Sequence, residues 1–320
     1  MTGMTDQTGA GGRRRKPYEG TPDESYGKPP GGSYAGPVRR CFTVHHDGVT
    51  LPVSRGGRGR PLVLCPGLCS TQAELHELIG LLRRDHDVVT FDHRGHGFSS
   101  PGDRYTFDAF LGDFAAVMAQ VARLDLPEPP LLVGYSLGAD LALHHTADHP
   151  EAVGGLILID GANPVPEPFI TEEFLAEFRA MARETQRELD LTKGTDRQVL
   201  LTGQDVLDLQ IEMDVVRASI LEQYARIEHP ITMIMSTALA GPGTEGPAAR
   251  HNQLWRAGID RLLDARPHTG TTWLDADHRL VVTHAGRIAE IVGFGVGESG
   301  RGSCGNSKEF CGGEGRSEGC

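Results

Sequence analysis

The sequence lacks two features that would connect it to a membrane or to nucleic acid. No stretch of about 18 apolar residues occurs, so no membrane-spanning helix is expected. The 31 lysines and arginines are outnumbered by 43 aspartates and glutamates, which gives a formal net charge of −12. Binding to phosphate backbones requires a basic surface. We therefore expect neither a membrane partner nor a nucleic-acid partner.

Signals for export and for metal binding are missing as well. The basic run Arg13–Lys16 is not followed by the apolar segment that a signal peptide needs, so a cytoplasmic location is expected. The six cysteines include no C-x-x-C pair, which makes a zinc site unexpected. The oligomeric state is left open.

Glycine is concentrated at the two ends of the chain. Of 42 glycines, 9 lie in residues 1–40 and 10 in residues 293–320. We interpret residues 1–37 as a disordered Gly/Pro-rich head and residues 296–320 as a disordered Gly/Ser/Cys-rich tail. The middle is the part that is expected to fold.

Strand and helix patterns alternate over residues 61–160 and again after Pro230. Such alternation predicts an α/β fold with a mostly parallel sheet that helices cover on both faces. Residues 164–229 interrupt it with a mainly helical segment. Three helices are expected there, over residues 169–190, 196–207 and 211–227. We interpret this segment as a helical cap inserted into a core made of residues 38–163 and 230–295.

A G-x-S-x-G motif lies between a buried strand and a helix. The strand Leu131–Val133 leads into Gly134–Gly138, and the helix starts at Leu137. In this setting a sharp turn raises the serine hydroxyl above the end of the sheet, and the flanking glycines leave room for the turn. Ser136 is therefore the predicted nucleophile.

Acyl transfer also needs N–H groups that stabilise a negative oxygen. The backbone N–H of Leu137, the residue after the nucleophile, is one candidate. The other is the N–H of Leu68, in the loop that follows the strand Leu62–Leu64. We expect these two residues to form an oxyanion hole.

The sequence contains 14 histidines, of which His278 has the right position in the chain for a catalytic base. It follows a predicted strand at residues 271–274 and precedes the last helix. Four other histidines are interpreted as structural or solvated, namely His93, His96, His144 and His145.

The acid that would orient His278 is less clear from the sequence. In this fold it usually follows the strand after the inserted segment, but the loop there has only one carboxylate, Glu245, and it comes late. Asp160 ends the strand before the insertion, which should lie beside the nucleophile strand. Asp160 is the preferred acid and Glu245 the alternative.

Three segments together resemble the α/β-hydrolase superfamily, over about residues 40–295. Residues 92–99 are similar to its D-x-R-G-x-G-x-S segment, residues 134–138 to its nucleophile turn, and residues 149–160 to the helix end and strand that follow. The resemblance is to capped serine hydrolases of the esterase, lactonase and haloperoxidase-like branch. It implies an α/β-hydrolase fold and a Ser–His–acid triad, in which the loop of Arg94 only supports the active-site face.

The sequence departs from this family in two places. Pro66-Gly67 replaces the usual His-Gly of the oxyanion loop, and the acid after the cap is missing. Some relatives, including certain haloalkane dehalogenases, have the acid before the cap, which matches Asp160.

The hypothesis that results is a cofactor-free and metal-free serine hydrolase acting on an ester, lactone or thioester of a small, hydrophobic molecule. Two alternatives remain. The same triad could serve cofactor-free peroxidation, C–C bond cleavage or acyl transfer with cyclisation, or the scaffold could be a non-catalytic binding module.

Overall fold

A computed structural model describes residues 40–243 and 245–294, so the predicted disordered head and the predicted disordered tail both lie outside the described residues. The described strands are β1 (Arg40–His46), β2 (Val49–Gly57), β3 (Arg60–Cys65), β4 (His86–Phe91), β5 (Leu131–Tyr135), β6 (Gly155–Ile159), β7 (Ile231–Ser236) and β8 (Gly270–Leu274). The main helices are α1 (His76–Leu82), α2 (Phe107–Val121), α3 (Leu137–Asp148), α4 (Leu175–Thr192), α5 (Gly203–Ala218), α6 (Ile220–Ala225), α7 (Gly246–Ala265), α8 (Leu280–Thr283) and α9 (Ala285–Phe294). No helix in this part of the chain is long and apolar enough to cross a membrane.

The strands form one eight-stranded sheet in the order β1-β2-β4-β3-β5-β6-β7-β8. The pairs β1–β2 and β2–β4 are antiparallel. All other neighbouring pairs, from β4–β3 to β7–β8, are parallel. Every residue of β5 and β6 is buried because these central strands have helices on both faces. The predicted fold class is thereby confirmed.

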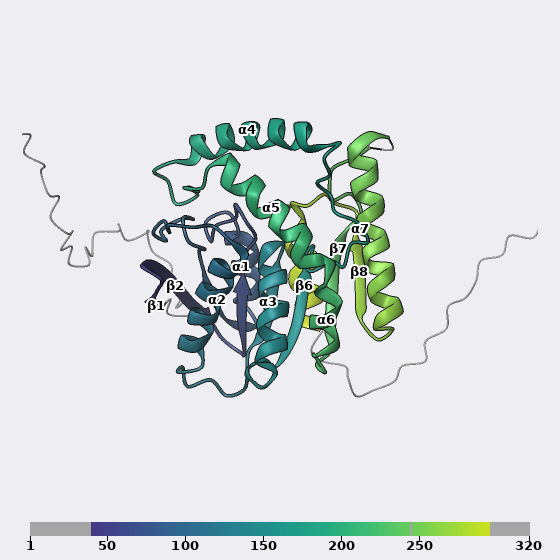
Figure 1. Ribbon diagram of the computed structural model, residues 1–320. Coiled ribbons are helices and arrows are strands. Elements are labelled where there is room, and N and C mark those ends of the chain that lie inside the picture. The colour runs from purple at the N-terminus through teal and green to yellow at the C-terminus, as the bar shows by residue number, and fades with distance from the viewer. Residues whose placement is uncertain (1–39, 244, 295–320) are drawn as a thin grey trace, which may run out of the picture. The chain divides into compact units, whose positions relative to one another are not determined.

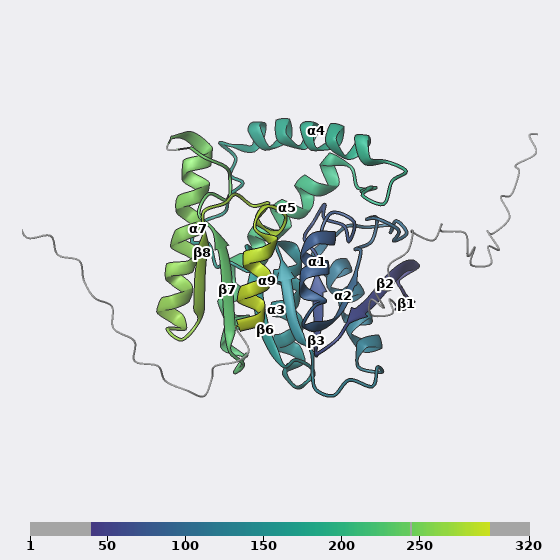
Figure 2. The same cartoon turned by 180° about the vertical axis from the view of Figure 1, so that it is seen from behind.

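Two hydrophobic clusters hold the helices against the sheet. Helices α2, α3 and α6 lie on the face seen in Figure 1, and α1 and α9 cover the opposite face in Figure 2. Phe110, Phe114 and Leu141 belong to the first cluster, and Leu78 and Ile288 to the second. All five side chains are completely buried, so the sheet is the shared inner layer of two cores.

The parallel strands bring distant parts of the sequence to one edge. Ser136 follows β5, Asp160 follows β6, Ser236 ends β7 and His278 follows β8 by a short loop. Because the carboxyl ends of parallel strands lie at the same edge, these four residues are gathered although up to 142 positions separate them.

Helices α4, α5 and α6 are inserted between β6 and β7, and α4 and α5 lie beyond the end of the sheet in Figure 1. Their bounds differ from the expected ones. The helix α5 begins after Thr202, whose hydroxyl accepts the N–H of Asp205 while the Asp205 carboxylate accepts the N–H of Thr202. This capping box stabilises the start of α5 at Gly203. The helix then continues without a break through residues 208–210, where two separate helices were expected.

Candidate active site

Ser136 lies in a strained turn between β5 and α3. Its backbone has φ of 51° and ψ of −122°, in a region that residues other than glycine rarely adopt. A Cβ atom at Gly134 would lie 2.3 Å from the carbonyl oxygen of Gly138, and one at Gly138 would lie 2.2 Å from that of Cys65. The turn therefore closes only with glycine at both positions, as the G-x-S-x-G motif has it.

A continuous chain of hydrogen bonds joins Ser136, His278 and Asp160. The Nε2 atom of His278 lies 2.9 Å from Oγ of Ser136, and Nδ1 lies 2.8 Å from Oδ2 of Asp160. Because a carboxylate only accepts, Nδ1 carries the proton and Nε2 is free to accept the proton of the serine hydroxyl. This arrangement has the geometry of a nucleophile and its general base.

Tyr135 fixes the segment that bears His278. Its hydroxyl donates a 2.7 Å hydrogen bond to the backbone carbonyl of His278, and the two rings lie 5.3 Å apart. The G-x-S-x-G motif gives no signal for this contact, because Tyr135 occupies its variable position.

The carboxylate of Asp160 is completely buried and is hydrogen-bonded on both oxygens. Oδ1 accepts the N–H of Ser236 at 2.8 Å and Nε1–H of Trp255 at 3.0 Å. The hydroxyl of Ser236 lies 2.7 Å from Oδ2, which also faces His278. A buried charge needs such partners, so these donors hold the carboxylate in place beside the imidazole.

Ser236 and Trp255 were not predicted from the sequence. Ser236 is the last residue of β7, close to the place where the family usually has its acid, and it donates to the relocated carboxylate. Glu245, the alternative acid, is exposed next to the start of α7. Among the described contacts it has no hydrogen bond or ion pair with His278, so the structure does not bring the two together.

Leu68 and Leu137 line the same cavity as Ser136 and His278. Within the described residues, the backbone N–H groups of both leucines have no hydrogen-bond partner. The loop approaches closely because Gly67 has no side chain, since a Cβ there would lie 3.0 Å from Cβ of Ser136. Both leucines thus line the cavity of Ser136 with a backbone donor that has no partner among the described residues, as a candidate oxyanion hole needs.

Two buried histidines hold the loop of residues 66–69 in place by hydrogen bonds. Nε2–H of His93 donates to the carbonyl of Pro66 at 2.8 Å. Nε2 of His96 accepts the N–H of Cys69 at 3.0 Å, while its Nδ1–H donates to the carbonyl of Arg94 at 2.8 Å. Burial lowers the pKa of His93 to about 3 and that of His96 to about 4, so both rings are neutral. Their role is to position the loop.

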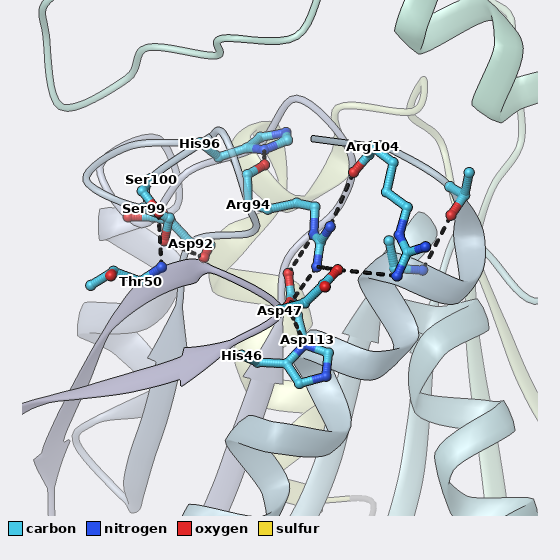
Figure 3. A network of polar contacts seen from close by, with 12 residues as sticks. His46, Asp47, Thr50, Asp92, Arg94, His96, Ser99, Ser100, Arg104 and Asp113 are labelled. Atoms are coloured by element: carbon cyan, nitrogen blue, oxygen red, sulfur yellow. Dashed lines mark hydrogen bonds and ion pairs between the residues drawn. The ribbon is translucent and has the colours of Figure 1, made fainter. Parts of the chain in front are cut away.

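The loop of residues 92–99 is itself fixed by a buried ion pair, shown in Figure 3. Arg94 is completely buried, and its guanidinium donates to both oxygens of Asp113 at 2.7 and 2.9 Å. A further N–H of Arg94 donates to the carbonyl of Arg104, and His46 lies 2.8 Å from Asp113. The same loop is bound to the inserted segment, because the N–H of Gly97 donates to the carbonyl of Gln198.

A cavity of about 460 Å³ opens onto the Ser136 hydroxyl. Its size lies within the range of small-molecule sites, about 300–1,000 Å³. Helices α4 and α5 supply much of its wall. The apolar side chains that line it are Leu68, Leu137, Phe169, Ile170, Phe178, Met181, Val206, Leu209, Met213, Leu239 and Trp255. In the part of the chain that the structure describes, no group of three His, Cys, Asp or Glu side chains is arranged to hold a metal ion.

Comparison with known proteins identifies the fold family. A family model described as alpha/beta hydrolase fold matches residues 60–207. The chain is 29% identical over 133 residues to 2-(acetamidomethylene)succinate hydrolase from Mesorhizobium japonicum, a match covering 41% of this chain and 45% of that protein. It is also 29% identical over 164 residues to a non-heme haloperoxidase from Rhodococcus erythropolis, covering 48% and 58%.

Solved structures agree on the fold. Haloalkane dehalogenase DbeA from Bradyrhizobium elkani aligns over 81% of this chain and 97% of that chain, with a TM-score of 0.59 and 16% identity. The protein has the α/β-hydrolase fold, and its residues 60–207 are similar to that family. Its matches span about half the length of these curated relatives.

Proposed function

We propose that the protein is a capped serine hydrolase that cleaves an ester, lactone or thioester of a small, mostly apolar molecule. The observation that carries the proposal is the hydrogen-bonded chain from Ser136 through His278 to Asp160, which opens into a cavity of small-molecule size. Leu68 and Leu137 line this cavity, and their backbone N–H groups, which have no partner among the described residues, support the same chemistry. The relatives named as hydrolases agree with it.

In the proposed reaction, Nε2 of His278 takes the proton from Ser136 as Oγ attacks the substrate carbonyl carbon. The resulting oxyanion accepts hydrogen bonds from Leu68 and Leu137. When the intermediate collapses, the bond to the leaving oxygen or sulfur breaks, and His278 returns its proton to that atom. Water then attacks the acyl-enzyme while His278 again acts as base, which releases the acid and restores the serine. Asp160 keeps the ring oriented and stabilises its protonated form.

The cavity supports a hydrophobic substrate. Most of the side chains around it are apolar, and those from α4 and α5 cover the serine as a cap would. Apolar groups that leave water for such a surface supply binding free energy of about 25 cal/mol per Å². The cap also limits the size of the molecule that can reach Ser136.

Hydrolysis of p-nitrophenyl esters by wild type and Ser136→Ala tests the proposal. We expect turnover by the wild type, a loss of at least about 1,000-fold in the variant with an unchanged circular dichroism spectrum, and fluorophosphonate labelling of Ser136. Free acid as the only acyl product would distinguish hydrolysis from transfer to another acceptor. A folded wild type with no turnover and an unlabelled Ser136 would reject the proposal in favour of a binding module.

A further inference from the structure

The cavity contains ionisable side chains that the proposed reaction does not use. They come from the inserted helices and from α7: Glu188 on α4, Asp214 and Arg217 on α5, and His251 on α7. Among the described residues that line the cavity, Arg217 is the only lysine or arginine. The charge that a substrate meets therefore depends on whether Arg217 is free to bind an anion.

The positive charge of Arg217 is already paired with the negative charge of Asp140. The guanidinium donates to both carboxylate oxygens of Asp140, at 3.0 and 2.7 Å. Asp140 is completely buried in the first turn of α3, one turn beyond Ser136. Although burial acts to lower the pKa of Arg217, the carboxylates of Asp140, Asp214 and Asp160 raise it. One guanidinium thus lies among three carboxylates.

Asp214 is held in the cavity wall by the backbone. Its Oδ2 accepts the N–H of Ile170 at 2.9 Å, a bond that fixes the carboxylate beside the entrance to the inserted segment. Glu188 adds a further negative charge on the exposed side of α4. The cavity histidine does not offset these charges, because burial, followed by the nearby Arg250, lowers the pKa of His251 and leaves its ring neutral.

We infer that the substrate carries no negative charge on the part that occupies this cavity. The inference rests on the proposed function and narrows its substrate class to neutral or cationic esters and thioesters. Among the described residues that line the cavity, Asp160, Glu188 and Asp214 are acidic, and the single basic side chain, Arg217, is already paired with Asp140 behind it. An anionic group would enter a weakly solvated space with a surplus of negative charge, where repulsion is much stronger than in water. A neutral group avoids this repulsion, and a cationic group is attracted.

Three p-nitrophenyl esters of equal chain length test the inference: the neutral hexanoate, the anionic half-ester of adipate and the cationic 5-(trimethylammonio)pentanoate. We expect kcat/KM for the anionic ester to lie about tenfold or more below both others. The difference in kcat/KM between the anionic ester and the other two should become smaller at high salt, because dissolved ions screen the charges that solvent reaches. Equal rates on all three esters, or equal losses for both charged ones, would overturn the inference.

Charge-removing variants identify the source of the discrimination. Asp214→Asn and the exposed Glu188→Gln should each reduce the penalty for the anionic ester by a factor of about three or more. Asp125→Asn is the matched control, since Asp125 lies in the loop before β5, at the opposite edge of the sheet. If Asp214→Asn does not fold, Glu188→Gln alone serves as the test. The inference is overturned if the penalty for the anionic ester is unchanged in Glu188→Gln and, where it folds, in Asp214→Asn.

The proposed function and the substrate preference fail in different ways. If no ester is hydrolysed and Ser136 resists a fluorophosphonate, the hydrolase proposal itself is wrong. If Ser136 is labelled and the neutral ester turns over, but the anionic ester turns over equally well, only the inference about charge is wrong.

Discussion

Replacement of Asp160 by asparagine tests the proposed triad most directly. The two side chains have nearly the same shape, so the buried space at the end of β6 stays filled. The amide oxygen of the new side chain can still accept the N–H groups of Ser236 and Trp255, as Oδ1 of Asp160 does. The amide NH₂ group then occupies the position of Oδ2, facing Nδ1 of His278.

The consequence is a change of tautomer in His278. An amide NH₂ donates, so Nδ1 must give up its proton and accept, and the proton moves to Nε2. Nε2–H then points at Oγ of Ser136, 2.9 Å away, and cannot take the serine proton. We expect kcat to fall by about 1,000- to 10,000-fold, which corresponds to about 4–5.5 kcal/mol, with little change in KM.

The assay compares wild type, Asp160→Asn and Glu245→Gln on p-nitrophenyl hexanoate, with folding checked by circular dichroism. Glu245→Gln should keep the wild-type kcat, because Glu245 is exposed and makes no described contact with His278. An Asp160→Asn enzyme that retains more than about a tenth of wild-type kcat would refute the reasoning. So would a large loss in Glu245→Gln, which would restore the more usual position of the acid.

Three further predictions concern other parts of the site and of the fold. His96→Phe removes the acceptor of the Cys69 N–H, so we expect a lower kcat and a loss of about 1–3 kcal/mol in the free energy of unfolding, measured in urea. Gly138→Ala places a Cβ 2.2 Å from the Cys65 carbonyl oxygen, so the turn at Ser136 should not form. We expect the variant to give no soluble protein whose Ser136 reacts with a fluorophosphonate. Burial lowers the pKa of His145 from 6.5 to about 4. Between these two pH values only the unfolded chain binds this proton, so the free energy of unfolding falls as the pH drops. In urea titrations, His145→Gln should reduce this dependence of the free energy of unfolding on pH by about 1.4 kcal/mol per pH unit.

Much of the architecture could be predicted because its signals are local. Alternating strand and helix patterns predicted the parallel sheet, and the strand–turn–helix setting of the G-x-S-x-G motif predicted the turn at Ser136. Chain order was enough to select His278 from many histidines, because parallel strands present their ends at one edge. Asp160 was preferred for the same reason, as the residue at the end of the strand beside β5.

The remaining features depend on contacts between distant residues. Ser236 and Trp255 reach Asp160 from 76 and 95 positions away, and nothing in their local sequence signals a hydrogen bond to a carboxylate. The pairing of Arg217 with Asp140 spans 77 positions and depends on how α5 lies over α3. The start of α5 was a local signal that went unused, because the capping box at Thr202 was present in the sequence.

The position of Asp160 before the insertion has a consequence for how the substrate preference of the proposed hydrolase can change. With the proposed acid directly after β6, the loop of residues 237–243 after β7 supplies no carboxylate to His278, and Leu239 and Ala240 from this loop line the cavity. In the usual family layout the same loop must keep a carboxylate in register, which restricts its length and sequence. Here Thr237 and Ala238 have to stay, because they bond to residues 274–276 just before His278, but residues 239–243 can change in length and sequence without removing a proposed catalytic group. This loop is therefore the natural place to graft new substrate contacts onto an unchanged reaction centre.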